Sequence, residues 1–249
     1  MKIVILSDLH IAESGSPIWD TDTTAHFNTA IDLISGISSI DAIFVSGDIA
    51  DKGSQWAYDY VSRRLDCLCI PTYFVPGNHD NVNILRSTMN TQWCHHYKTI
   101  DIKDWRFILL SSVVPDPDNK NVNMGRGYLS KDEMSWFRKR LNTDKKVCII
   151  LHHPPIEPEG WLNRKILENR FEFNEIIKHH KNVKLVIYGH THCHSIQEIG
   201  DVKYICAPSI GFAFNKSLPR FQIDKGHEGF LIIDINNQYI ECNTILLNE

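Results

Sequence analysis

Short apolar runs and longer amphipathic stretches alternate along most of the chain. The run 43–45, Ile-Phe-Val, is bounded by polar residues and rich in β-branched and aromatic side chains, which favours a buried strand over a helix. Gly47 allows a sharp turn after this run, so Asp48 is expected to project its carboxylate from the carboxyl end of the strand, where sheets of this kind bind ligands. One such Asp alone would be interpreted as a loop cap, but other strands of this chain end in the same way.

The same pattern predicts further strands and helices. Apolar runs predict strands at 2–7, 70–75, 97–102, 106–112, 147–151 and 183–188. Apolar residues at helical spacing, with Ser54 and Ser130 as capping residues, predict helices at 23–38, 55–66, 82–90, 131–142 and 168–180. The polar stretch 114–126 predicts a long surface loop.

The pattern changes after residue 192. Strand-like runs now follow one another without helices, at 195–199, 203–206, 230–235 and 239–246. Asn236-Asn237 favours a hairpin turn between the last two of these runs. Because helices and strands alternate first and strands come alone afterwards, we expect an α/β fold in which two packed sheets have helices on the outside. No linker or repeat is visible, so residues 1–249 are expected to form a single domain.

Composition narrows the class of protein. The chain of 249 residues is 43% hydrophobic and 22% charged, which is ordinary for a globular protein. A formal net charge of −4 argues against binding to extended nucleic acid, which requires a basic surface. No apolar run approaches the roughly 18 residues of a membrane span. The seven cysteines are odd in number, scattered and free of a C-x-x-C pair, which predicts free thiols and a cytoplasmic location.

Polar clusters rich in metal-ligand side chains follow five of the predicted strands. They are Asp8-x-His10, Gly47-Asp48, Gly77-Asn78-His79-Asp80, His152-x-Pro154 and Gly189-His190-x-His192. Each cluster alone is a weak signal, but five at successive strand ends indicate a two-metal hydrolase, whose cations about 3.5–4 Å apart act on one phosphoryl group. Two cations that close require an anionic bridging ligand, and Asp48 is the candidate.

The mixture of ligand types narrows the choice of metal. Carboxylate, amide and imidazole ligands suit Mn, Fe or Zn and argue against an all-oxygen calcium site. We expect two divalent ions per chain, with Mn²⁺ preferred. Asp8 and His10, at i and i+2, are expected to face one ion if the backbone between them stays extended.

The five clusters, in this order, resemble the signature of the calcineurin-like metallophosphoesterase family from residue 8 to residue 192. The resemblance implies a four-layer metallophosphoesterase fold with two mixed β-sheets packed as a sandwich. It implies one metal held by Asp8, His10, Asp48 and His192. It implies a second metal held by Asp48, Asn78, His152 and His190.

Neighbours of the predicted ligands have separate expected roles. His79 is placed to donate a proton to the leaving oxygen or to stabilise charge in the transition state. Asp80 is expected either to orient the His79 imidazole, as a second catalytic residue, or to cap the following helix. His153 is expected just outside the metal ligands, and His194 in an exposed loop.

The complete motif set is most similar to that of the class III cyclic nucleotide phosphodiesterases. This similarity implies hydrolysis of a phosphodiester by a metal-bridging hydroxide, with 3′,5′-cyclic AMP as the preferred substrate. Phe212, Phe214 and Phe221 are candidates for stacking on the base, while Asn78 and Arg220 are candidates for binding the phosphate. The alternative is that the phenylalanines belong to the core and that Arg220 is a solvated surface charge.

Two other function classes stay open at this point. One is a broader enzyme that acts on phosphomonoesters, nucleotide pyrophosphates or nucleic-acid ends. The other is a non-catalytic interaction module, which the presence of every ligand and of His79 disfavours. A small-molecule nucleotide is the expected partner, and the family resemblance also allows a homodimer through the strand-rich segment 195–246.

Overall fold

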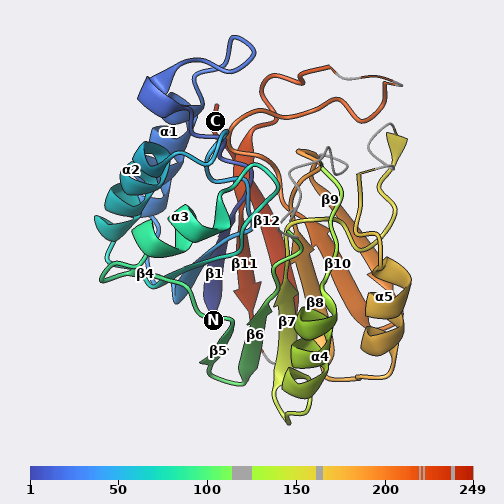
Figure 1. Ribbon diagram of the computed structural model, residues 1–249. Helices are drawn as coiled ribbons and strands as arrows, with labels where there is room; N and C mark the ends of the chain where they lie inside the picture. The colour runs from blue at the N-terminus through green and yellow to red at the C-terminus, as the bar shows by residue number, and fades with distance from the viewer. Residues whose placement is uncertain (114–124, 161–164, 219, 221, 237–238, 249) are drawn as a thin grey trace.

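The computed structural model of the chain has four layers, with two β-sheets face to face and helices on both outer sides (Figure 1). It describes residues 1–113, 125–160, 165–218, 220, 222–236 and 239–248. The predicted loop 114–126 therefore lies mostly outside the described residues, as do Asn237 of the predicted turn and Phe221. The predicted α/β architecture of two mixed sheets with helices outside is confirmed.

The first sheet contains the amino-terminal strands and the last hairpin. In spatial order its strands are β12 (Ile240–Leu246), β11 (Gly229–Ile235), β1 (Lys2–Leu6), β2 (Ala42–Val45), β3 (Thr72–Phe74) and β4 (Cys94–His95). The strands β1 to β4 are parallel, whereas β11 pairs antiparallel with both β1 and β12. The parallel order places the chain segments that follow β1, β2 and β3 at one edge of the sheet.

The second sheet is built in a similar way from the middle of the chain. In spatial order its strands are β5 (Thr99–Ile102), β6 (Trp105–Leu109), β7 (Lys146–Ile150), β8 (Val183–Tyr188), β10 (Val202–Cys206) and β9 (Ser195–Ile199). The central strands β6, β7, β8 and β10 are parallel, and β5 and β9 pair antiparallel at the two edges. Strand β4 has two residues and was missed by the sequence pattern, which needs a longer run.

Helices cover the outer faces of both sheets. They are α1 (Thr23–Ser35), α2 (Gln55–Asp66), α3 (Val82–Thr88), α4 (Lys131–Arg140) and α5 (Arg170–Lys178), with a short 3₁₀ helix η1 (Glu13–Gly15). In Figure 1, α1 to α3 lie beside the first sheet and α4 and α5 beside the second. Ser54 and Ser130 accept hydrogen bonds from the first turns of α2 and α4, as the sequence predicts.

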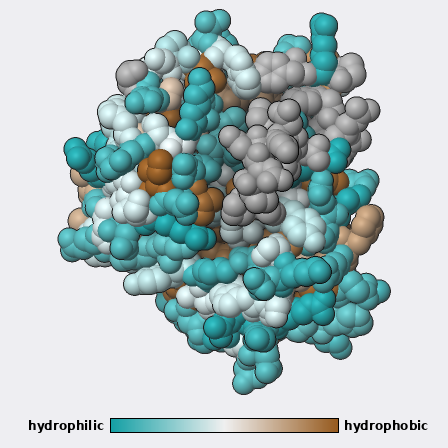
Figure 2. All heavy atoms as spheres, viewed as in Figure 1, coloured by the Kyte–Doolittle hydropathy of each residue, from teal (hydrophilic) through white to brown (hydrophobic). Residues whose placement is uncertain are grey.

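Three apolar clusters fill the spaces between the layers. Ile3 and Ile5 of β1 point into the cluster between the two sheets, whereas Val4 and Leu6 point into the cluster under α1 to α3. Burial on both faces explains why the run is continuously apolar instead of alternating. Hydrophilic side chains cover much of the face in Figure 2. Within the described residues, no helix has the length and apolar character needed to cross a membrane.

Backbone hydrogen bonds join the segments that follow the parallel strands. Asp8 N donates to Gly47 O at 3.0 Å, and Gly189 N donates to His152 O at 3.0 Å. The loop after β10 joins the same edge, since Gly211 N donates to Asp8 O at 3.0 Å. These bonds fix the predicted ligand segments of both sheets in one place.

The packing between the sheets generates a stability prediction. The rings of Phe44 and Phe107, both 0% exposed, stack with centroids 4.6 Å apart across the two sheets. Phe44→Ala should lower the free energy of unfolding by about 3–5 kcal/mol in urea denaturation, because it leaves a cavity between the sheets. Phe171→Ala, at a side chain 74% exposed, should change it by less than about 1 kcal/mol. Equal effects of both substitutions would contradict the proposed packing.

Candidate metal centre

Most of the predicted ligand side chains come from residues with left-handed backbone. Positive φ angles occur at Asp8 (51°), His10 (47°), Asp48 (50°), His190 (71°) and His192 (54°). Non-glycine residues seldom adopt this conformation, which costs of order 1–3 kcal/mol and concentrates at functional sites. The condition of an extended backbone between Asp8 and His10 is therefore not met, because β1 ends at Leu6 and both residues have left-handed backbone. Both side chains nevertheless belong to one group of ligand atoms.

Two glycines leave the room that the ligand side chains occupy. Gly47 has φ 98°, and a Cβ there would lie 2.5 Å from His152 Nδ1. A Cβ on Gly77 would collide with the Asp48 carboxylate. The sharp turn expected at Gly47 is present, and the close approach of Gly77 is a second constraint that the sequence motif contains.

The first group of ligand atoms comes from Asp8, His10, Asp48 and His192, which are all buried and whose ligand atoms lie within 4.8 Å of one another. His192 Nε2 is 3.2 Å from Asp8 Oδ1 and 3.2 Å from His10 Nε2. Two imidazole nitrogens that face each other at this distance repel unless a proton or a cation lies between them. This donor set therefore fits a divalent cation.

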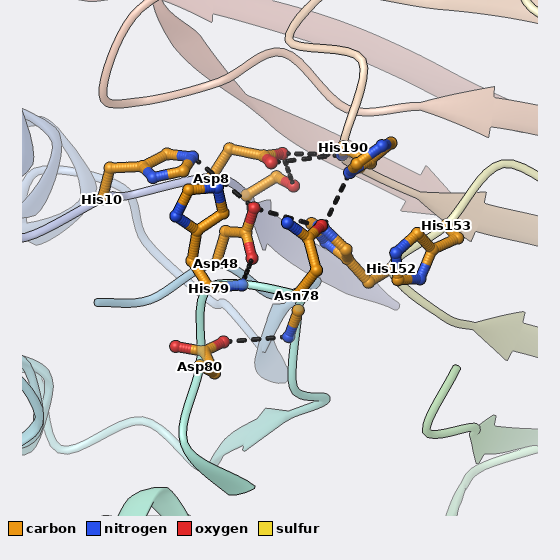
Figure 3. Close-up of polar contacts among 12 residues, drawn as sticks. Asp8, His10, Asp48, Asn78, His79, Asp80, His152, His153 and His190 are labelled. Atoms are coloured by element: carbon orange, nitrogen blue, oxygen red, sulfur yellow. Dashed lines mark hydrogen bonds and ion pairs between the residues drawn. The ribbon is translucent and has the colours of Figure 1, made fainter. Parts of the chain in front are cut away.

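The second group surrounds His152 (Figure 3). His152 Nε2 is 3.3 Å from Asp48 Oδ2, 3.2 Å from Asn78 Oδ1 and 3.2 Å from His190 Nδ1. Asp48 Oδ2 also lies 3.6 Å from His10 Nε2 of the first group. Its other oxygen, Oδ1, accepts a hydrogen bond from His79 N at 2.8 Å. One carboxylate oxygen thus faces both groups, which is the geometry that a bridging ligand requires.

Backbone carbonyls orient two of the imidazoles. His152 Nδ1 donates to Ser46 O at 2.8 Å, and His192 Nδ1 donates to Phe212 O at 2.7 Å. With Nδ1 protonated in this way, each ring presents the lone pair of Nε2 to the centre of the site. Nε2 is therefore the nitrogen of each ring that would bind a cation.

His153 lies directly behind the second group. Its side chain is buried, Nδ1 is 2.7 Å from Ser112 Oγ, and its ring centroid is 4.8 Å from that of His190. Its Nε2 atom has no hydrogen-bond partner among the described residues. A ligand atom of His153 lies within 4.8 Å of ligand atoms of His152 and His190, so these three histidines form a further group that could hold a cation. Ser112, which holds His153 through Nδ1, was not identified from the sequence.

The electrostatics of the site come from buried carboxylates facing imidazoles. Burial raises the pKa of Asp48, but His152 and His10 outweigh it and hold that pKa well below its usual range. Burial lowers the pKa of His152, but Asp48 outweighs it and raises the pKa to about 9. Burial and the charges of neighbouring imidazoles hold the pKa of His190 well below its usual range, so this ring is neutral. Ionised carboxylates and neutral imidazoles are the forms that bind divalent metals, so His152 would release a proton when a cation binds, whereas His190 is already neutral.

Asp80 does not orient His79. Its carboxylate accepts hydrogen bonds from Ala50 N at 3.0 Å, Gly77 N at 2.9 Å and the Tyr58 hydroxyl at 3.1 Å, and Figure 3 shows it apart from the ligand side chains. Burial and the charge of Asp48 raise its pKa to about 6. Both sequence-based roles are corrected, because the cap of α3 is the following residue, Asn81. Asp80 instead ties the turn after β2 to the turn after β3.

Asp51 is the residue that holds the His79 ring, and the sequence analysis missed it. His79 Nδ1 donates to Asp51 O at 2.8 Å, and the Asp51 carboxylate lies 3.8 Å from the same nitrogen and 3.4 Å from His10 Nδ1. The His10 imidazole beside it outweighs the opposing effect of partial burial and holds the pKa of Asp51 below its usual value. The sequence signal was its position three residues after Asp48, in the loop that follows β2.

The predicted substrate-binding residues differ in burial and in the side chains that they contact. Phe212 is 1% exposed and packs against the rings of His10 and His192, with centroids 4.9 and 4.7 Å away. The prediction that Phe212 stacks on a base is corrected, because its ring supports the ligand imidazoles. Phe214 is half-buried and stacks on His192 at 4.4 Å. Arg220 is exposed, and its phosphate-binding role stays a prediction.

His194 is also placed differently from the prediction. It is half-buried instead of exposed, and its Nδ1 lies 2.7 Å from Cys206 O. It therefore attaches the segment after His192 to the end of β10.

Comparisons with known proteins agree with this geometry. Residues 1–194 match the family of calcineurin-like phosphoesterases. The chain is 28% identical to a 3′,5′-cyclic-nucleotide phosphodiesterase of Nostoc sp., over 94% of this chain and 88% of that protein. It is 30% identical to a probable cyclic nucleotide phosphodiesterase of Vesicomyosocius okutanii, over 86% of this chain and 88% of that protein.

A solved structure supports the fold independently. A dimetal phosphatase from Danio rerio superposes with a TM-score of 0.73 at 14% identity, over 98% of this chain and 95% of that one. At this identity the similarity concerns the fold alone. The family match covers most of the chain, and the buried histidines and aspartates supply ligands for a divalent metal centre. This chain therefore belongs to the calcineurin-like phosphoesterase family and is a metal-dependent phosphoric ester hydrolase.

Proposed function

We propose that the protein is a two-metal phosphodiesterase that hydrolyses a cyclic nucleotide, with 3′,5′-cyclic AMP as the preferred substrate. The observation that carries the two-metal proposal is the position of Asp48 Oδ2, which lies 3.6 Å from His10 Nε2 and 3.3 Å from His152 Nε2. The names of the relatives from Nostoc and Vesicomyosocius support a cyclic nucleotide as the substrate class.

The proposed ligands are the two groups described above. Asp8, His10, Asp48 and His192 would hold one cation, and Asp48, Asn78, His152 and His190 the other, with Mn²⁺ preferred and Fe or Zn as alternatives. When bound, the cations supply positive charge that stabilises the negative charge developing on the phosphoryl oxygens.

His79 is proposed to act on the leaving oxygen. Its side chain is 42% exposed, in contrast to the buried ligands, so it can reach a substrate. Because Nδ1 donates to Asp51 O, Nε2 is the atom left to hold a proton for the departing alkoxide. Asp51 thus positions the ring, while the Asn78 amide points towards the candidate ligand side chains (Figure 3).

The remaining sequence-based predictions are retained as proposals. The apolar cluster shared by the two sheets supports one domain over residues 1–249. The buried free thiols of Cys148 and Cys206 support a cytoplasmic location. The net charge of −4 supports a small-molecule substrate over extended nucleic acid, and a homodimer stays a prediction from the family resemblance.

The function is tested by a substrate panel with Mn²⁺. We expect the highest kcat/KM for 3′,5′-cyclic AMP, compared with bis(p-nitrophenyl) phosphate, p-nitrophenyl phosphate and a nucleotide pyrophosphate. Cleavage of the generic diester without the cyclic nucleotide would retain the metal site and refute the substrate. Preference for the monoester or the pyrophosphate would establish the broader phosphatase or pyrophosphatase instead.

Replacement of the bridging carboxylate tests the metal arrangement. Asp48→Ala should lose both metals, measured by elemental analysis after gel filtration, and nearly all activity, because its oxygen belongs to both groups. Asp201→Ala, at an exposed residue between β9 and β10, is the matched control and should keep metals and activity. Retention of two equivalents of metal by Asp48→Ala at unchanged circular dichroism would show that Asp48 is not the bridge.

Replacement of His79 tests proton donation. His79→Ala should keep both metals and lose roughly 10²–10⁴-fold in kcat on cyclic AMP, whose alkoxide leaving group needs a proton. The loss should be much smaller on bis(p-nitrophenyl) phosphate, whose phenolate leaves without one. His179→Ala, at a side chain 69% exposed on the end of α5, serves as the control. An equal loss on both substrates would remove His79 from this role.

A further inference from the structure

Trp19 is held in an unusual backbone conformation close to the metal centre. Trp19 and Asp20 both have positive φ, 47° and 60°, in a two-residue turn closed by hydrogen bonds between Ile18 and Thr21 at 2.9 Å in both directions. Turns of this kind are normally formed by Asn-Gly, because both central residues need a positive φ, which is sterically unfavourable for a residue with a large side chain. A tryptophan at this position indicates that its side chain has a use that offsets the strain.

The turn is attached to the metal centre from its carboxyl side. Thr23 Oγ1, at the start of α1, donates to His10 O at 2.8 Å, and Asp22 caps the same helix by accepting from Ala25 N at 2.9 Å. The segment between His10 and α1 is therefore fixed at both ends. The position of Trp19 relative to the ligand residues is thus set by the fold.

Trp19 continues a wall of aromatic rings that begins at the metal ligands. Phe212 packs against His10 at 4.9 Å, and Trp19 packs edge-on against Phe212 at 4.8 Å. Phe214, stacked on His192, lies 6.2 Å from Trp19. Phe212 is 1% exposed, whereas Trp19 is 53% exposed. Trp19 is therefore the member of this wall with the largest surface for a ligand.

We propose that Trp19 is the stacking platform for the base of the substrate. The proposal rests on the nucleotide phosphodiesterase function above and assigns the residue that makes the site prefer a nucleotide over a smaller phosphate ester. A nucleotide whose phosphate is held at the ligand side chains would carry its base one sugar unit away, and Trp19, two ring contacts from His10, is the exposed ring within that reach. Stacking of a base on an aromatic side chain tolerates any base, because every base has a π-face. Phe212 and Phe214 then support the platform instead of forming it.

The test compares binding of AMP with binding of ribose 5-phosphate, which has the same phosphate and sugar but no base. Isothermal titration calorimetry on the Mn²⁺-loaded protein measures both constants, because AMP and ribose 5-phosphate are phosphomonoesters, which a phosphodiesterase binds without cleaving. In the wild type, AMP should bind about 5- to 100-fold more tightly than ribose 5-phosphate. In Trp19→Asn, the two should bind equally within about twofold, because the ring is gone while asparagine suits the left-handed backbone of the turn.

Two further variants make the result specific. Trp19→Phe should keep most of the preference for AMP, because a smaller aromatic ring is retained. Phe171→Asn removes an exposed aromatic ring from α5, in the outer helix layer, and should keep the full preference. Metal content and melting temperature of each variant verify that the site is intact, and ribose 5-phosphate affinity should stay constant throughout.

The outcomes separate this proposal from the proposed activity. An unchanged preference in Trp19→Asn, or no preference for AMP in the wild type, overturns the role of Trp19 even if cyclic AMP is hydrolysed. A preference that disappears in Trp19→Asn supports it even if cyclic AMP is not the substrate, because the measurement involves no hydrolysis.

Discussion

A buried carboxylate needs a hydrogen-bond donor or a positive charge at each of its oxygens, and the whole site is arranged around the carboxylate of Asp48. Oδ1 accepts the His79 N–H at 2.8 Å, while Oδ2 lies within 3.6 Å of an imidazole from each sheet. An unpaired charge at this depth would cost several kcal/mol, so removing either set of partners would leave Asp48 destabilising. The two sheets are thus coupled chemically at the position where their strand ends meet.

A second buried carboxylate serves the backbone instead of the metals. Asp80 binds the amides of Ile49, Ala50 and Gly77, and in this way fixes the turn that carries Asp48 against the turn that carries Asn78. In the proposed function, the four consecutive residues 77–80 therefore combine three tasks, namely a metal ligand, a proton donor and a support for the neighbouring turn. This separation explains why Asp80 lies below the ligand side chains in Figure 3 and not beside the His79 ring.

Support of the imidazoles comes largely from residues distant in the sequence. Phe212 contributes both its carbonyl, to His192 Nδ1, and its ring, to His10 and His192. The strand-rich end of the chain is therefore part of the metal centre, although the family match ends at residue 194. It also connects the ligands to Trp19, so that metal support and the proposed base platform share one aromatic wall.

The sequence by itself determined the order of strands and helices, the sandwich of two sheets and the five polar clusters at the strand ends. These features are local: an apolar run, a glycine that turns and a ligand side chain are all visible within a few residues. The two-residue strand β4 was beyond reach, because so short an element has no periodicity.

Only the tertiary structure decided which side chain does what within the clusters. The left-handed backbone at Asp8 and His10, the pairing of His79 with Asp51 and the burial of Phe212 all depend on bonds between segments that are far apart in the sequence. Side chains of the same type in the segments that follow β2 and β3, such as Asp48, Asp51 and Asp80, differ in role because each meets a different partner after folding. The residue types were set by the sequence, and the partners were set by the way folding brings together the loops at the strand ends.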